Sequence, residues 1–140
     1  SIYKRFTDFY IVNKNKLISW NQEDCKNIGL SKQKKNYIEN IFKEKNSIND
    51  LYDCTDQSII RNKLIKIKGI GNWTIDMFMI FTKGDLNIFP EGDLALINAI
   101  KKEYKVKTLD EIRNIAEKWA PYKTIATLYL WESLEDDFPS

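Results

Sequence analysis

The chain has 140 residues, of which 43% are hydrophobic and 30% charged, as expected for one globular domain with a single core. Its net charge of +2 excludes a uniformly basic surface, so a nucleic-acid surface must be a local patch. The absence of histidine excludes histidine-based catalysis and histidine metal sites, and two cysteines are too few for a four-thiolate cluster. A reducing, intracellular setting is expected, either the bacterial cytoplasm or the nucleus. No apolar run is long enough to span a membrane, so no membrane partner is expected.

Apolar residues recur at helical spacing along most of the chain, whereas strand signals are weak, so an all-α fold is predicted. The helices are expected over residues of about 21–26, 31–45, 56–66, 72–82, 93–104, 108–119 and 122–134. Their expected N-terminal residues are, in chain order, Asn21 or Ser19, Ser31, Thr55, Gly71 or Asn72, Asp93 and Thr108, with Pro121 at the start of the last helix.

The apolar pattern assigns a core-facing side to each of the middle helices. The residues expected to be inward are Ile59, Ile60, Leu64, Ile67, Trp73, Ile75, Met77, Phe78, Ile80, Leu94, Leu96, Ile97 and Ile100. One domain is predicted over residues 1–140. Within it, a helix-hairpin-helix is expected at about 56–82, a loop at 83–93 and an acidic tail at 134–140.

Two glycines, Gly69 and Gly71, flank Ile70 between two predicted helices. Glycine permits a positive φ and close approach of another backbone, and Ile70 can pin such a turn. The free N–H groups at the start of the following helix form a positive end that suits a phosphate oxygen. A tight helix–helix connection with no ligand explains the glycines equally well.

Asp93 follows Gly69 by 24 residues and begins an apolar helix. For an isolated aspartate, helix capping is the more common role. A carboxylate facing a pocket can instead stabilise an oxocarbenium-like sugar cation and orient or deprotonate water. Hydrolysis of an N-glycosidic bond needs this chemistry and requires neither histidine nor a metal ion. Glu91, which precedes the turn, is expected at the surface.

A family resemblance rests on several motifs taken together. They are Leu64-x-x-Ile67-Lys-Gly-Ile-Gly-Asn-Trp-Thr74, Phe89-Pro-x-Gly-Asp93, Trp119-Ala-Pro-Tyr-Lys-Thr-Ile-Ala126 with Trp131, and Gly29-Leu-Ser31-x-x-Lys34-x-x-Tyr37-Ile38. In combination they resemble the helix-hairpin-helix DNA glycosylase superfamily, in its 3-methyladenine DNA glycosylase II branch for alkylation repair. The likeness covers residues of about 2–131.

The resemblance implies a helical bundle of this glycosylase type. It also implies an enzyme that flips an alkylated purine such as 3-methyladenine out of double-stranded DNA and hydrolyses its N-glycosidic bond. Asp93 matches the catalytic aspartate. The residues implied to contact DNA phosphate are Gly69, Ile70, Gly71, Lys68 and Thr74. Those implied for the base pocket are Trp73, Met77 and Trp131, and the indole rings among them can stack on a cationic base. No cofactor and no side-chain metal site are implied, although a monovalent cation, Na⁺ or K⁺, is expected at the carbonyls of Ile67 and Ile70.

Two departures refine what the resemblance implies. Bifunctional relatives have a lysine two residues after the second glycine, whereas this chain has Trp73, so a monofunctional enzyme without lyase activity is expected. The family also has an upstream helix pair and a side chain that wedges into the DNA stack, and neither has a counterpart in this sequence. The fold is therefore expected to lack an N-terminal part, supplied by a missing segment or by a separate chain.

Two other classes of function stay open at this stage. A non-catalytic helix-hairpin-helix module would bind DNA without releasing a base, and its binding would depend on salt but not on DNA sequence. A helical scaffold for a protein partner would not bind DNA at moderate salt.

Overall fold

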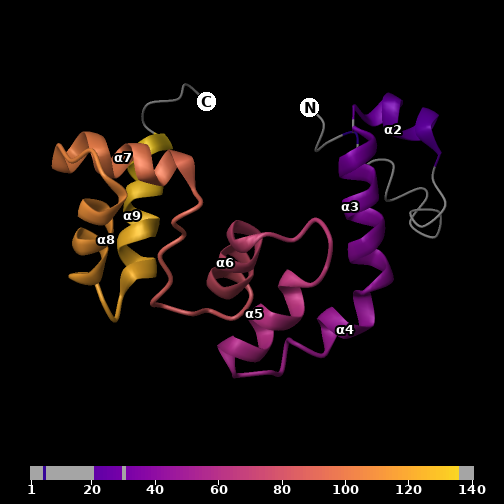
Figure 1. Cartoon of the computed structure of the whole chain (residues 1–140), viewed down its shortest axis with the longest axis horizontal. Coiled ribbons are helices and arrows are strands. Elements are labelled where there is room, and N and C mark those ends of the chain that lie inside the picture. The colour runs from indigo at the N-terminus through magenta and orange to yellow at the C-terminus, as the bar shows by residue number, and fades with distance from the viewer. Residues whose placement is uncertain (1–4, 6–20, 30, 136–140) are drawn as a thin grey trace. The chain divides into compact units, whose positions relative to one another are not determined.

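The structure is a computed structural model that describes residue 5 and residues 21–29 and 31–135 (Figure 1). The described residues form helices and no strands, which confirms the all-α prediction. The helices are α2 (Gln22–Ile28), α3 (Lys32–Lys43), α4 (Lys45–Asn49), α5 (Gln57–Ile65), α6 (Asn72–Phe81), α7 (Leu94–Tyr104), α8 (Leu109–Glu117) and α9 (Lys123–Glu135). None of these helices is long and apolar enough to cross a membrane.

Side-chain caps define most of the helix starts, as the sequence predicted. The Asn21 side chain accepts a hydrogen bond from the Asp24 amide at the start of α2, and Ser31 accepts one from Lys34 at the start of α3. Thr108 caps α8 in the same way through the amide of Glu111. For α5 the predicted cap was wrong: Asp56, not Thr55, accepts from the amides of Ser58 and Ile59. The alternative cap Ser19, and residues 136–140 of the acidic tail, lie outside the described residues.

Three residues predicted to face the core are exposed instead. Ile59, Trp73 and Leu94 are 45%, 47% and 76% exposed, and each lies in the first turn of its helix. Helical side chains tilt toward the N-terminus, so a side chain in the first turn projects beyond the helix end and has no preceding turn to pack against. The periodicity of apolar residues alone does not predict this exposure at helix starts. Further along the same helices, Ile60, Ile75 and Leu96 are buried as predicted.

The chain divides into two compact units, residues 1–70 and residues 71–140, and the division falls within the glycine hairpin. The first unit contains α2 to α5 and the second contains α6 to α9 (Figure 1). The assignment of residues 1–140 to one domain stays a prediction.

In the first unit, helix α3 approaches the hairpin backbone closely. Gly69 has a φ of +105°, and a Cβ atom placed on it would overlap Cγ of Tyr37. Beside this contact, the side-chain amide of Asn40 donates to the carbonyl of Lys68 at 3.3 Å. Glycine is therefore required at position 69 both for its backbone angle and for the space occupied by Tyr37.

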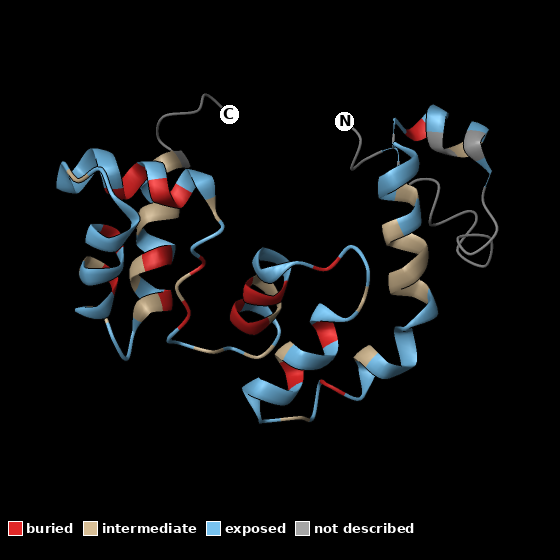
Figure 2. Cartoon of the chain, viewed as in Figure 1, coloured by how far each residue is buried: buried red, intermediate tan, exposed pale blue. Residues whose placement is uncertain are grey.

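In the second unit, a buried cluster joins α7 to α8 and α9. Its buried members are Leu96, Ile97, Ile100 and Ile112, and Trp119, Leu130 and Trp131 pack against it. Figure 2 shows the buried turns of α7, α8 and α9 on the sides of these helices that face one another. This cluster holds α7, and with it the residue that caps α7, in a defined position.

Replacing Gly69 with alanine is expected to lower the free energy of unfolding by about 2–4 kcal/mol, because the new methyl group overlaps Tyr37 and strains a positive φ. Chemical denaturation of the two proteins measures the difference. Gly71→Ala is the matched control, since position 71 has an ordinary φ of −106° and no atom within 4 Å of the added Cβ. Equal decreases of stability in the two variants would contradict the packing role assigned to Gly69.

Candidate functional site

The loop of residues 82–93, which connects α6 to α7, is held at one end by Thr124. This threonine is 3% exposed, and its hydroxyl accepts from the Ile88 amide at 2.9 Å and donates to the Asp85 carbonyl at 2.7 Å. The Thr124 amide also donates to the Leu86 carbonyl. The loop is therefore fastened to the start of α9 through three hydrogen bonds of one residue.

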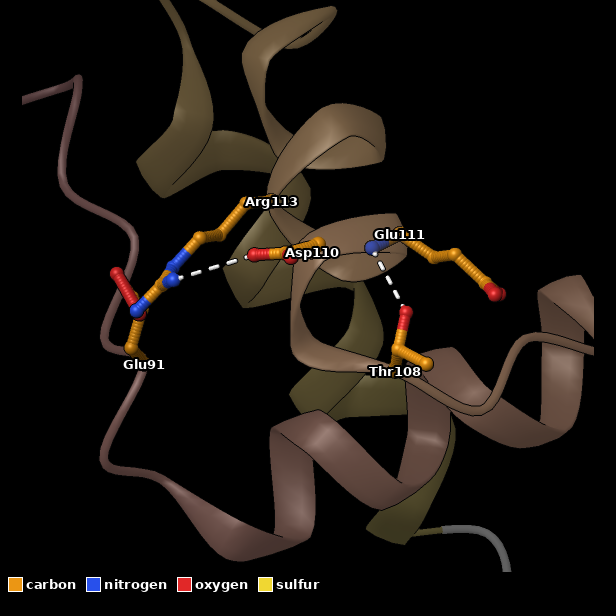
Figure 3. A network of polar contacts seen from close by, with 5 residues as sticks. All are labelled: Glu91, Thr108, Asp110, Glu111 and Arg113. Carbon is orange, nitrogen blue, oxygen red and sulfur yellow. Dashed lines mark hydrogen bonds and ion pairs between the residues drawn. The ribbon is translucent and has the colours of Figure 1, made fainter.

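The other end of the loop is held by α8 and by an aromatic contact. Arg113 pairs with the Glu91 carboxylate at 2.8 Å, as well as with Asp110 of its own helix (Figure 3). The hydrogen bond and the charge of Glu91 raise the pKa of Arg113. The ring of Phe89 meets that of Trp119 edge to face at 6.0 Å. Glu91 lies at the surface as predicted, but its partner Arg113 was not foreseen, because no local pattern links residues 22 positions apart.

Asp93 follows this loop and caps α7. The Asp93 amide donates to the Pro90 carbonyl, which closes a four-residue turn. One carboxylate oxygen, Oδ1, accepts from the Leu96 amide at 2.9 Å. The other oxygen, Oδ2, accepts from the indole Nε1 of Trp73 at 3.0 Å. Asp93 is thus both the helix cap expected of an isolated aspartate and the acceptor of a bond from a second helix.

This geometry suits a carboxylate that acts as a fixed anion. The N-terminus of α7 and its amide stabilise the negative charge, and the indole donor fixes the rotation of the carboxylate. Asp93 is partly exposed, so the residue is within reach of a ligand or a water molecule. A fixed, accessible anion of this kind can stabilise a developing positive charge.

The residues predicted for the base pocket, Trp73, Met77 and Trp131, all lie in the second unit. Trp73 is bonded to Asp93, with about half of its side chain exposed. Met77 is partly buried one turn further along α6. Trp131 lies on α9, where its ring is stacked with that of Phe81 at 6.1 Å and packs against the buried cluster. Among the described residues, the Asp93 carboxylate is hydrogen-bonded to Trp73 and Leu96 and not to Met77 or Trp131.

The part of the hairpin turn up to Ile70 belongs to the first unit. The Ile70 amide donates to the Ile67 carbonyl at 3.0 Å, so this amide is not free for a ligand, and the Ile70 side chain is buried. Lys68 is exposed beside the turn. The Ile67 carbonyl retains one lone pair for a cation, since a carbonyl oxygen has two.

The start of α6 belongs to the second unit. Gly71 precedes α6 at the N-cap position and provides no side-chain cap, and Thr74 in the first turn of the helix is exposed. The first amides of a helix have no partner within the helix. The N–H groups at the start of α6 are therefore available to an anion.

Several known proteins are similar to this chain, although no family model matches it. The Bacillus subtilis protein YfjP, provisionally named a DNA-3-methyladenine glycosylase, is 39% identical over 92 residues, which are 64% of this chain and 32% of that protein. The alkylbase DNA glycosidase-like protein mag2 of Schizosaccharomyces pombe is 38% identical over 76 residues, or 52% of this chain and 36% of that protein. The matched part thus spans about a third of the length of these relatives.

Two solved structures have the same fold. The 3-methyladenine DNA glycosylase Mag1 of Schizosaccharomyces pombe, in complex with abasic DNA, matches with a TM-score of 0.82 at 23% identity, over 99% of this chain and 73% of that one. A DNA-3-methyladenine glycosidase of Bacillus halodurans matches with a TM-score of 0.71 at 30% identity, over 94% of this chain and 65% of that one. The motifs, the helical fold and these relatives agree: the chain is similar to the alkylation-repair, 3-methyladenine glycosylase branch of the helix-hairpin-helix DNA glycosylase superfamily.

Proposed function

We propose that this chain is the catalytic part of a monofunctional DNA glycosylase that removes alkylated purines, such as 3-methyladenine, from double-stranded DNA. The observation that carries the proposal is the carboxylate of Asp93, fixed between the α7 amide of Leu96 and the indole of Trp73. The relatives named for glycosylase activity support it. Such an enzyme acts where DNA lies, in the bacterial cytoplasm or the nucleus.

The chemistry assigned to Asp93 needs no metal ion. As the bond between the sugar and the base lengthens, positive charge develops on the sugar, and the carboxylate stabilises it. A water molecule that donates a hydrogen bond to Asp93 can then attack the sugar carbon, with the carboxylate accepting its proton. Trp73 occupies the position where bifunctional relatives have a lysine, so this chain has no amine there to form a Schiff base and cut the strand.

The base pocket is assigned to Trp73, Met77 and Trp131. An alkylated purine is cationic, and an electron-rich indole attracts a cation lying over its face. Because the indole N–H of Trp73 is directed at Asp93, the position of its ring is coupled to that of the carboxylate. A base held against Trp73 would therefore have its glycosidic bond close to Asp93.

Binding of the DNA sugar–phosphate backbone is assigned to the residues of the hairpin. In the second unit, the amides of Gly71 and of the start of α6 would hold a DNA phosphate, with Thr74 beside it. In the first unit, Gly69 and Lys68 are assigned to a phosphate contact of their own. The Ile70 amide is occupied within the turn, so Ile70 would contribute its carbonyl and its buried anchor rather than a donor. A Na⁺ or K⁺ ion bound by the carbonyls of Ile67 and Ile70 would add positive charge near the phosphate contact of the first unit.

Asp93→Asn is expected to slow base release by about 10³-fold while leaving DNA affinity nearly unchanged. Asparagine also caps helices, through its side-chain carbonyl, so the fold is retained. The negative charge and the oxygen that could accept a proton from water are both removed. Single-turnover release of 3-methyladenine from methylated duplex DNA, followed by chromatography, measures the rate.

Two outcomes would contradict the proposal in different ways. Base release by the Asp93→Asn variant at the wild-type rate would remove Asp93 from the chemistry. Duplex binding by the wild-type chain without any base release would favour the second candidate, a non-catalytic DNA-binding module. That candidate is favoured by one observation, namely that the matched part spans about a third of the length of the glycosylase relatives.

Trp73→Phe is expected to reduce the single-turnover rate by about tenfold, because phenylalanine keeps a stacking ring but has no donor for Asp93 Oδ2. Stability should change little, since Trp73 is half exposed. Tyr129→Phe, another exposed aromatic residue of the same unit, is the control and should keep the wild-type rate. A normal rate in Trp73→Phe would show that the indole bond does not position the carboxylate.

Gly71→Ala is expected to weaken duplex binding by about tenfold without a decrease in stability. The added methyl group meets nothing in the protein and projects into the open space where a phosphate would approach the α6 amides. Fluorescence anisotropy with a labelled duplex measures the affinity. Unchanged affinity would mean that no phosphate lies against Gly71.

A further inference from the structure

The two units carry opposite net charge, although the whole chain is close to neutral. Residues 1–70 contain 14 lysines and arginines against 8 acidic residues, a net +6, and residues 71–140 contain 8 against 12, a net −4. A polyanion is therefore attracted to the first unit much more strongly than the total of +2 suggests.

Part of this positive charge gathers around one contact, the hydrogen bond from Asn40 of α3 to the Lys68 carbonyl. Two hollows in the protein surface share Asn40, Lys43 and Lys68 among their lining residues. One, of about 530 Å³, extends to Lys63 and Lys66 of the α5 end, and the other, of about 630 Å³, extends along α3 to Lys32. The two hollows make a continuous basic surface that begins at the hairpin.

Helix α3 presents a polar stripe to this surface. Lys32, Asn36, Asn40 and Lys43 follow one another at intervals of four, four and three residues and line the second hollow. Lys32 and Lys43 are only about 20° apart around the helix and about 16 Å apart along its axis. Phosphates of one DNA strand follow one another about every 3.4 Å along the duplex axis, so the stripe can span several of them.

The lysines of the stripe are not neutralised by ion pairs recorded among the described residues. Lys35 of α3 pairs with Glu39, whereas no such pair is recorded for Lys32, Lys43 or Lys68. Glu44 and Asp50 also line the first hollow, so positive charge exceeds negative there without being alone. Like charges held around one hollow repel each other unless an anion lies between them.

We propose that the α3 stripe of Lys32, Asn36, Asn40 and Lys43 is a second contact surface for the sugar–phosphate backbone of duplex DNA. This contact is additional to the phosphate contacts assigned to the hairpin. The stripe carries amides and ammonium groups on a helix. The aromatic ring that lines the same hollow, Tyr37, lies against Gly69, so the surface suits the backbone of a duplex rather than unpaired bases. The inference rests on the proposed function for its DNA partner, and it concerns affinity rather than the chemical step.

The test is the salt dependence of duplex binding by the full chain. The slope of log K against log salt should fall by about 0.9 for every phosphate that a variant no longer neutralises. Lys32→Gln combined with Lys43→Gln should therefore reduce the slope by about 1–2 and weaken binding about tenfold at roughly 0.1 M salt. The matched control is Lys34→Gln with Lys45→Gln, which removes the same charge from the same unit but from residues that line neither hollow.

The outcomes separate this inference from the proposed function. A reduced slope in the stripe variant alone supports the second surface. Equal slopes for the stripe variant, the control and the wild type overturn it, even if the wild type releases base normally. Equal reductions in both variants would also overturn it, since they would show a general charge effect. A wild-type chain that binds DNA but releases no base would refute the glycosylase activity and leave the slope comparison valid.

Discussion

The structure of the site depends on the two hydrogen bonds accepted by the Asp93 carboxylate. Through Oδ1 the side chain caps α7, and through Oδ2 it holds the indole of Trp73 on α6. One acidic group thus connects the end of the loop to the helices on both sides of it. The role of Asp93 as a helix cap and its role as an anion at the site are the same arrangement, because the helix N-terminus that needs a cap also stabilises the charge.

An anion can only act on a sugar if its position is fixed, and the loop that precedes Asp93 is fixed by tertiary contacts. Thr124 of α9 binds the first half of the loop, whereas Arg113 of α8 and the ring of Trp119 bind the second half. Helices α8 and α9 pack on the same buried cluster as α7. The contacts that hold the loop and the helix that follows the loop are therefore anchored in one core. The acidic second unit therefore supports the proposed chemistry, and the basic first unit carries the charge that attracts the proposed polyanion.

Glycine occupies the two hairpin positions 69 and 71 for different physical reasons. Gly69 has a positive φ and lies against Tyr37, so it is required by the protein itself. Gly71 has an ordinary backbone angle and open space around its Cα atom, so the fold does not require it. A glycine without a structural requirement, at the uncapped start of a helix, is consistent with close approach by a ligand.

The sequence by itself determined the helical class, the caps at Ser31 and Thr108, the hairpin and the likeness to the glycosylase superfamily, because these depend on local spacing and on motifs of neighbouring residues. It left Asn21 and Ser19 as alternative caps of α2, and the structure shows Asn21 in that role. Only the tertiary structure decided which apolar residues at helix starts are exposed, as Ile59, Trp73 and Leu94 show, because exposure there depends on what lies beyond the helix end. It also decided the side-chain partners that Asp93, Glu91 and Gly69 find on other helices. Each of these partners lies 20 or more residues away, and contacts over that distance arise from packing, which leaves no periodic pattern in the chain.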